Sequence, residues 1–504
     1  MMATARSHND APVSHKLSEL VTGLVEIDGA AERDIVGLSL DSRSTQPGDL
    51  FLACQGTHAH GQNFIGAAIK AGAVAVLRET QRGTNSAVTV PVFDLENLHE
   101  QLGLIAARFY GDPARDLTMI AVTGTNGKTS VSHFLAQALS AAAKIPCGVI
   151  GTLGNGLYGY LEAATHTTPD AIQLHALLDE LRSAGARNVV MEASSHGLQQ
   201  GRMNNIPLHT AIFTNLSRDH LDYHGEMSAY AAAKRRLFLM PGLRHAVVNG
   251  DDAFGRELRH YLPDGVQCLN YGLISSSVEV RGTHLQLTGN GLTMDVSTPW
   301  GNGRLRSKLL GRFNASNLLA VLTTLLLLDI PLTECLRRLE KTQTVAGRME
   351  RFGARGQPTA VVDYAHTPDA LEQVLQTLRE HLVPGAQLWC VFGCGGDRDQ
   401  GKRPLMGKAA ERLADRVIVT DDNPRIEKPS SIIAAILSGM TKPDAAHVQH
   451  SRAQAISFAL SQAAAHDIVL IAGKGHEEYQ LIGTQRLVFS DRQYVADWLR
   501  GAAR

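Results

Sequence analysis

The segment that decides the fold class is Thr123-Gly124-Thr125-Asn126-Gly127-Lys128-Thr129-Ser130. An apolar run at residues 117–122 precedes it and predicts a buried strand, and a helical pattern at residues 129–143 follows it. A strand, a glycine-rich turn and a helix are typical of a loop whose backbone N–H groups hold phosphates. Lys128 would reach the terminal phosphates and Thr129 would bind Mg²⁺. The alternative is a glycine turn with an exposed lysine, because Val122 stands where the usual first glycine would be.

Short apolar runs alternate with helical patterns along the rest of the chain. Alternation of this kind predicts α/β domains with parallel, doubly wound sheets. The apolar runs after the loop are residues 188–193, 210–214, 245–248, 359–363, 388–392, 416–420 and 468–472. We expect a smaller N-terminal α/β domain at 1–113, a central domain with the phosphate loop at 114–345, and a Rossmann-like C-terminal domain at 346–504.

Polar clusters follow nearly every predicted strand. They begin at Thr125, Glu192, Asn215, Asp363, Gly393, Asp421 and Gly473. Ligands bind beyond the carboxyl ends of the strands in such sheets. We therefore expect an active site where two of the domains meet.

The composition excludes several classes of protein. The 504 residues include 48 Lys and Arg against 49 Asp and Glu, which gives no electrostatic reason to expect nucleic acid as a partner. The six cysteines form no CxxC pair, which favours a reducing compartment. Residues 1–20 lack the apolar core of a signal peptide, and the apolar run at 318–328 is about half the ~20 residues of a membrane span. We expect a cytoplasmic monomer with no membrane insertion and a buried helix at 318–328.

A few single residues suggest chemistry on their own. His220 and Glu192 follow neighbouring predicted strands, and both are candidate metal ligands beside a nucleotide site. Spacing alone makes Lys234 a solvated helix lysine. Arg425, in Asp422-Asn423-Pro424-Arg425, is either an exposed arginine in a turn or a clamp for a carboxylate.

Together these segments resemble the Mur ligase family, the ATP-dependent amide-bond formers of bacterial cell-wall synthesis. The resemblance runs from about Leu40 to Arg492 and is strongest to the members that add meso-2,6-diaminopimelate. It rests on LDSR at 40–43, TGTNGKT at 123–129, EASSHG at 192–197, NLSRDHLDYHG at 215–225, GRFNASN at 311–317, GRME at 347–350, VVDYAHTPDA at 361–370, FGCGGDRD at 392–399, DDNPR at 421–425 and AGKGHE at 472–477.

The resemblance implies a role for each matching residue. The catalytic set is Lys128, Lys234, His220, Glu192 and Arg348. The ATP site is Gly124, Thr125, Asn126, Gly127, Lys128, Thr129, Ser130, Asn317 and Asp363. Mg²⁺ is held by Thr129, Glu192, His220 and Lys234, the last modified to N6-carboxylysine. The UDP-muramoyl dipeptide contacts Leu40, Ser42, Thr57, His58, Ala59, Thr167, Thr168, Ser194, Gln200 and Arg202. Diaminopimelate contacts Arg398, Asp422, Asn423, Pro424, Arg425, Gly473 and Glu477. His166 replaces the family's asparagine.

The implied reaction is ATP-dependent addition of diaminopimelate to UDP-N-acetylmuramoyl-L-alanyl-D-glutamate, in peptidoglycan precursor synthesis. ATP phosphorylates the side-chain carboxylate of D-glutamate, and the amine of diaminopimelate attacks the acyl-phosphate. The cofactors are ATP and Mg²⁺, and the partners are these small molecules.

Three alternatives stay open. A lysine-adding ligase of the same type differs at the DNPR position, so Arg425 argues against it. Folylpolyglutamate synthase shares the ATP loop and the lysine, but it lacks DNPR and the N-terminal motifs. A nucleotide-dependent switch or motor would use the loop without ligase chemistry.

Overall fold

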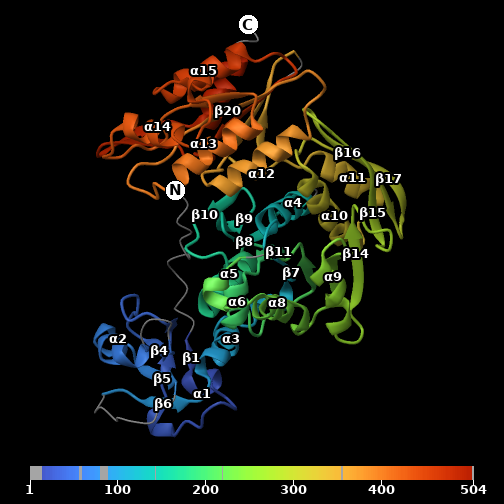
Figure 1. Cartoon of the computed structure of the whole chain (residues 1–504). Helices are drawn as coiled ribbons and strands as arrows, with labels where there is room; N and C mark the ends of the chain where they lie inside the picture. The colour runs from blue at the N-terminus through green and yellow to red at the C-terminus, as the bar shows by residue number, and fades with distance from the viewer. Residues whose placement is uncertain are drawn as a thin grey trace. The chain divides into compact units, whose positions relative to one another are not determined.

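The structure is a computed structural model that describes residues 14–55, 60–79, 89–141, 143–217, 219–353 and 356–501. Its chain divides into two compact units, one ending at Leu269 and one beginning at Asn270. Figure 1 shows the helices and strands of the chain with their labels. Both units are mixed α/β, as the sequence predicts. Among the described helices, none combines the length and the apolar character that crossing a bilayer requires.

A small parallel sheet forms the first part of the first unit. Its strands lie in the order β3 (Gly37–Ser39), β4 (Asp49–Ala53), β5 (Ala75–Glu79) and β6 (Val92–Leu95). Successive strand side chains point to opposite faces. Leu50 and Leu52 therefore pack in the same cluster as Ile105 of α3 (Leu98–Phe109), whereas Phe51 packs with Ala68 of α2 (Ile65–Ala71).

The sheet that carries the glycine-rich loop follows. Strand β7 (Thr118–Thr123) lies between β11 (Asn188–Glu192) and β12 (Thr210–Phe213), and all three are parallel. The next strands outward are β8 (Gly148–Gly151) beside β11 and β13 (His245–Asn249) beside β12. The predicted runs thus agree with the strands to within a residue at each end. The edge hairpins formed by β8, β9 (Gly154–Leu157) and β10 (Tyr160–Glu162) are antiparallel, which the sequence analysis did not predict.

Three antiparallel strands lie near the start of the second unit. β15 (Val280–Thr288), β16 (Gly291–Thr298) and β17 (Gly301–Ser307) form two hairpins. The predicted buried helix is α10 (Arg312–Leu327), on which every residue from 317 to 327 is buried. The hairpins were not predicted, although buried Leu292, Met294 and Val296 alternate with more exposed residues along β16.

The C-terminal sheet has the order β18 (Glu350–Phe352), β19 (Thr359–Asp363), β23 (Ile468–Ala472), β20 (Leu388–Phe392), β21 (Arg416–Val419) and β22 (His447–Val448). Only β18 is antiparallel to its neighbour. Two helix layers cover the sheet. α12 (Pro368–Arg379), α13 (Lys402–Leu413) and α14 (Pro429–Leu437) pack on one face, and α15 (Arg452–Gln462) and α16 (Asp491–Gly501) pack on the other.

Two buried polar contacts tie the elements of the second unit together. His381 accepts a hydrogen bond from the Gly311 N–H through Nε2 (2.6 Å) and lies 2.7 Å from the Thr288 carbonyl through Nδ1, and burial lowers its pKa. Arg452 forms a two-bond pair with Asp491, 2.7 Å at each oxygen, and both side chains are fully buried. Arg452 also donates to the carbonyl of Ala472 at the end of β23 (2.9 Å), so it joins both helices to the sheet.

Arg452→Ala should destabilise this sheet strongly. It leaves Asp491 as a buried charge without its partner, and such a loss costs about 3–5 kcal/mol. All three tryptophans of the chain, Trp300, Trp389 and Trp498, lie in the second unit, so urea unfolding followed by tryptophan fluorescence reports on it. The matched control is Arg500→Ala, which breaks an exposed pair with Asp497. Equal urea midpoints for the two variants would contradict a stabilising role for the buried pair.

Candidate active site

The glycine-rich loop runs from the end of β7 to the start of α4 (Lys128–Ser140). Gly124 has φ +150° and Gly127 has φ +87°, backbone conformations that side chains disfavour. A Cβ on Gly124 would also lie 1.9 Å from Thr214 Oγ1. Both glycines are therefore required by the path of the loop, and α4 begins at the residue that follows the second of them.

Two lysines converge on one carbonyl oxygen in this loop. Lys128 Nζ donates to the carbonyls of Gly124 (2.8 Å) and Thr125 (2.9 Å), and Lys234 Nζ donates to the same Gly124 oxygen (2.9 Å). Lys234, on α8 (Met227–Arg235), is 1% exposed and lies 4.2 Å from the ring centre of Tyr230. Lys234 is therefore buried and not the solvated lysine that its spacing alone suggests.

This environment disfavours the charged form of Lys234. Burial, together with the nearby charge of Lys128, lowers the pKa of Lys234 to about 6. At pH 7 most of this side chain is thus an unprotonated amine. Burial also lowers the pKa of Lys128. A free amine is the form of lysine that attacks electrophiles.

Glu192 lies next to this loop because β11 and β7 are in register, with Glu192 opposite Val122. Its carboxylate is 1% exposed. Oε1 accepts the Thr152 N–H (2.9 Å), and Oε2 accepts the hydroxyls of Thr129 (2.9 Å) and Thr152 (3.2 Å). Burial raises the pKa of Glu192. Thr129 and Glu192, two of the predicted metal ligands, are thus in direct contact.

His220 is more loosely placed. Its φ of +52° is left-handed, and its side chain is 45% exposed. The ring contacts those of His196 and Tyr230, with centroids 5.0 and 6.1 Å away. Within the described part of the chain, no three or more His, Cys, Asp or Glu side chains are grouped as a metal site.

The residues predicted to hold the muramoyl dipeptide form one hydrogen-bond network. Thr168 Oγ1 donates to the Glu192 carbonyl (2.8 Å) and accepts from the Ser194 N–H (3.0 Å). Arg202 donates to the Thr168 carbonyl (2.6 Å) and to Gln200 Oε1 (2.9 Å). Thr167 Oγ1 lies 3.0 Å from Thr152 Oγ1. The structure therefore brings all five residues of this set close to Glu192, a candidate metal ligand. They are Thr167, Thr168, Ser194, Gln200 and Arg202.

The residues predicted to contact the UDP end are only partly visible. Leu40 and Ser42 lie in the turn after β3, where Asp41 pairs with Arg43. Thr57, His58 and Ala59 lie outside the described residues. His166 is exposed, and its Nδ1 lies 3.1 Å from Thr165 Oγ1.

Three predicted nucleotide residues belong to the second unit. Asn317, on α10, donates to Asn314 Oδ1 (3.2 Å). Asp363 is buried, and its two oxygens accept the N–H groups of Met349 (2.7 Å) and Ala365 (2.8 Å). Arg348 lies over the ring of Tyr364, 5.0 Å from its centre. In this structure Asp363 therefore holds the turn that carries Arg348.

The predicted diaminopimelate residues gather around a left-handed turn. Arg425 has φ +53° and bonds through its backbone to Leu481 and Gly483 of the hairpin β24 (Tyr479–Ile482) and β25 (Gln485–Val488). Its Nη1 donates to the Gly396 carbonyl (2.8 Å). Gly396 belongs to the loop at residues 393–399 and directly precedes the charged residues at its end. The Gly396 N–H in turn bonds to the carbonyl of Asn423 (2.9 Å), and the Pro424 carbonyl accepts the Glu427 N–H (3.2 Å).

The rest of this set surrounds the turn. Asn423 Nδ2 donates to Glu477 Oε2 (2.9 Å), and buried Asp422 has a pKa raised by burial. Gly473, with φ +117°, leaves no room for a side chain, since a Cβ would lie 2.6 Å from Asp422 Oδ2. Arg398 is exposed. Sequence reasoning missed Lys474, which bonds to both Asn423 and Glu477. Its position between two glycines directly after an apolar strand was the available signal.

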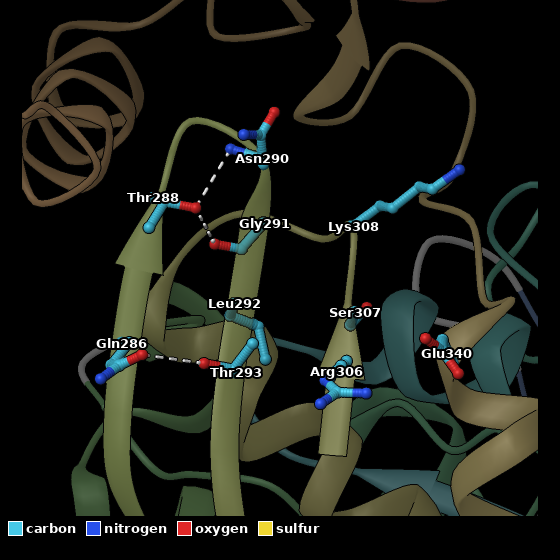
Figure 2. A pocket seen from close by; sticks show the side chains of 10 residues that line it. All are labelled: Gln286, Thr288, Asn290, Gly291, Leu292, Thr293, Arg306, Ser307, Lys308 and Glu340. Carbon is cyan, nitrogen blue, oxygen red and sulfur yellow. Dashed lines mark hydrogen bonds between the residues drawn. The ribbon is translucent and has the colours of Figure 1, made fainter. Parts of the chain in front are cut away.

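A separate groove of about 290 Å³ opens on the β15–β17 hairpins of the second unit (Figure 2). None of the predicted site residues lines it. Its walls are Gln286, Thr288, Asn290, Gly291, Leu292, Thr293, Arg306, Ser307, Lys308 and Glu340. The charged side chains at its rim are exposed and of both signs.

Comparison with known proteins finds family matches over most of the chain. Residues 34–110 match the description "Mur ligase family, catalytic domain", residues 122–325 match "Mur ligase middle domain", and residues 347–475 match "Mur ligase, glutamate ligase domain".

Curated relatives and a solved structure agree with these matches. The UDP-N-acetylmuramoyl-L-alanyl-D-glutamate–2,6-diaminopimelate ligases of Ectopseudomonas mendocina and Pseudomonas aeruginosa are both 52% identical, over 90% and 92% of this chain and 93% and 94% of their own. A solved structure with the same ligase name has a TM-score of 0.79 and 38% identity, over 98% of this chain and all of its own. The chain has the glycine-rich loop, the buried Lys234 and the turn around Arg425 in place. Together with these matches, they show that this chain belongs to the Mur ligase family.

Proposed function

We propose that this protein adds meso-2,6-diaminopimelate to UDP-N-acetylmuramoyl-L-alanyl-D-glutamate at the expense of ATP. The single observation that carries the substrate is Arg425, a guanidinium held by a turn between a glycine-rich loop and a hairpin. The relatives that are 52% identical carry this activity in their names. The three-domain division at residues 113 and 345, action as a monomer and a cytoplasmic location are parts of the same proposal.

In the first half-reaction, an oxygen of the D-glutamate side-chain carboxylate attacks the γ-phosphorus of ATP, and ADP leaves. A carboxylate and a triphosphate repel each other, so cations must offset the charge that builds on the transferring phosphoryl group. Lys128 supplies one such cation. The backbone amides of residues 124–130 supply hydrogen bonds to the phosphates. His220, Arg348, Asn317 and Asp363 stay assigned to this nucleotide and metal site.

Thr129 and Glu192 fit a Mg²⁺ ion, because a hydroxyl and a carboxylate 2.9 Å apart are the oxygen donors that this ion prefers. When bound, the ion neutralises phosphate charge. Lys234 joins them only if it becomes an anion. Its unprotonated amine adds to CO₂ and releases a proton, which gives a carbamate with two oxygens. The low pKa of Lys234 favours this reaction.

In the second half-reaction, the unprotonated amine of diaminopimelate attacks the acyl carbon, and the amide forms as the nitrogen loses a proton and phosphate leaves as hydrogen phosphate. Glu477 and Asn423 would hold an ammonium group of diaminopimelate. Arg425 would hold its distal carboxylate. Lysine lacks that carboxylate, so a lysine-adding enzyme has no use for Arg425. Folylpolyglutamate synthases share the fold of this chain at 19–20% identity, and their fold similarity carries no argument about substrate.

Lys128→Ala should abolish ligation in a folded protein. It removes a cation that acts on the transferring phosphoryl group, and loss of one such group typically lowers kcat by about a hundredfold or more. ADP release in the presence of all three substrates measures the effect. The control is Lys144→Ala, an exposed lysine beyond α4. Normal turnover by folded Lys128→Ala would remove the assignment of the ATP site.

Lys234→Ala should be nearly inactive, and a small carboxylate such as formate should partly restore it by filling the vacated space. Wild-type protein supplied with ¹³C-bicarbonate should show a carbamate carbon in its NMR spectrum, absent from the variant. The signal should fade as the pH falls through about 6, because the amine of Lys234 then takes up a proton and stops reacting with CO₂. A wild-type spectrum without this carbon would reject the modification.

Arg425→Ala should lose most activity with diaminopimelate while ATP binding survives. Loss of a charged hydrogen-bond partner costs roughly 30-fold to several thousand-fold in catalytic efficiency. Alanine keeps the same left-handed strain, so the comparison isolates the guanidinium. The measurement is the ratio of kcat/KM for diaminopimelate over lysine, with exposed Arg412→Ala as the control. A wild type that prefers lysine, or an unchanged ratio, would show that Arg425 is not the selector.

A further inference from the structure

Lys474 is a buried cation to which the proposed reaction gives no role. It lies in the turn between β23 and β24, and its side chain is 0% exposed. Burying an ammonium group is costly unless it is paired and hydrogen-bonded. A cation kept at this depth, next to residues assigned to a substrate, therefore needs an explanation.

Both hydrogen-bond partners of Lys474 are in the proposed amino-acid subsite. Nζ donates to Asn423 Oδ1 (3.1 Å) and to Glu477 Oε2 (3.0 Å), and it lies 5.5 Å from the ring centre of Tyr479. Asn423 Nδ2 donates to the same Glu477 oxygen (2.9 Å). The three side chains thus form a closed ring of hydrogen bonds.

This ring fixes the orientation of both neighbours. An ammonium only donates, so Asn423 must turn its oxygen toward Lys474 and its NH₂ toward Glu477. The Leu481 N–H, which bonds to the same Asn423 oxygen (3.0 Å), supports this orientation. Glu477 is held by Oε2 alone, and Oε1 has no hydrogen bond to any residue that the structure describes. Glu477 is 18% exposed, so Oε1 can receive a ligand's ammonium group.

We propose that Lys474 is a positioning residue for the amino-acid substrate, which aims Glu477 at the substrate ammonium. The inference rests on the proposed function, because it takes Glu477 and Asn423 as substrate contacts. It adds a residue that never touches the substrate itself.

The charges around Glu477 agree with this role. Burial alone would raise the pKa of Glu477, but the hydrogen bonds from Asn423 and Lys474 outweigh it and lower the pKa. The other titratable or charged groups that interact electrostatically with Glu477 are His476, Tyr364, Asp422 and Arg452. Of the two cations, Arg452 is bonded to Asp491, so Lys474 is the one bonded to Glu477.

Lys474→Met tests the proposal, because methionine keeps a long apolar stem without the charge. We expect KM for diaminopimelate to rise on the order of 10- to 100-fold, more than kcat falls, with KM for ATP and for the UDP-dipeptide within about twofold of wild type. The acid limb of kcat/KM for diaminopimelate should move to higher pH, since Glu477 then takes up a proton more readily. Exposed Lys408→Met is the matched control. Wild-type KM and pH profile in Lys474→Met would overturn the proposal.

Glu477→Gln and the double variant Lys474→Met/Glu477→Gln complete the experiment. The double variant leaves neither charge unpaired, so it tests the proposal even if Lys474→Met does not fold. If Lys474 acts through Glu477, the double variant should have the KM of Glu477→Gln alone, whereas additive effects would overturn the proposal. If Glu477→Gln leaves KM for diaminopimelate unchanged, the substrate assignment itself fails. If it raises KM but Lys474→Met does not, only the role of Lys474 fails.

Discussion

In-register pairing of parallel strands is the constraint on which both candidate sites depend. Glu192 pairs with Val122, and Phe213 pairs with Thr123. Strands β11, β7 and β12 therefore end at the same edge of the sheet, where the loops that follow them begin. Asp363 pairs with Ala472 in the C-terminal sheet, which brings the turn that carries Arg348 and the turn that carries Lys474 to one edge. A shift of one residue would turn every side chain to the opposite face.

The two edges handle charge in opposite ways. At the glycine-rich loop, Lys128 and Lys234 donate to one carbonyl oxygen, and an incoming phosphate would balance the positive charge of Lys128. Around Asn423, two of the cations are already paired inside the protein, Lys474 with Glu477 and Arg452 with Asp491. The first arrangement suits a highly charged ligand that arrives and leaves. The second suits a zwitterion, whose own charges nearly cancel.

Local pattern predicted the strands well and the contacts between them poorly. The strands at 359–363, 388–392 and 468–472 have the predicted bounds, since each is a short apolar run bounded by polar residues. The hairpins β15–β17 were missed because their alternation is short and interrupted by glycines. Motifs pointed to Asp363 and Arg425 as candidate site residues. The hydrogen bond from the Met349 N–H to Asp363 depends on tertiary packing, and so does the bond from Lys474 to Asn423, 51 residues away. Spacing alone also predicted an exposed Lys234, because the Gly124 carbonyl to which its side chain donates is distant in the sequence.

The left-handed backbone of Arg425 limits how this protein can evolve. A residue with a Cβ in that conformation costs roughly 1–2 kcal/mol, and only glycine, asparagine and aspartate adopt it readily. The residue at position 425 is therefore constrained both by the role of its side chain and by the conformation of its backbone. Substitution by valine, isoleucine or threonine would disturb the turn as well as the charge. A lineage that changes its amino-acid substrate can therefore replace Arg425 by glycine or by an unbranched residue without added strain, whereas β-branched residues are disfavoured here.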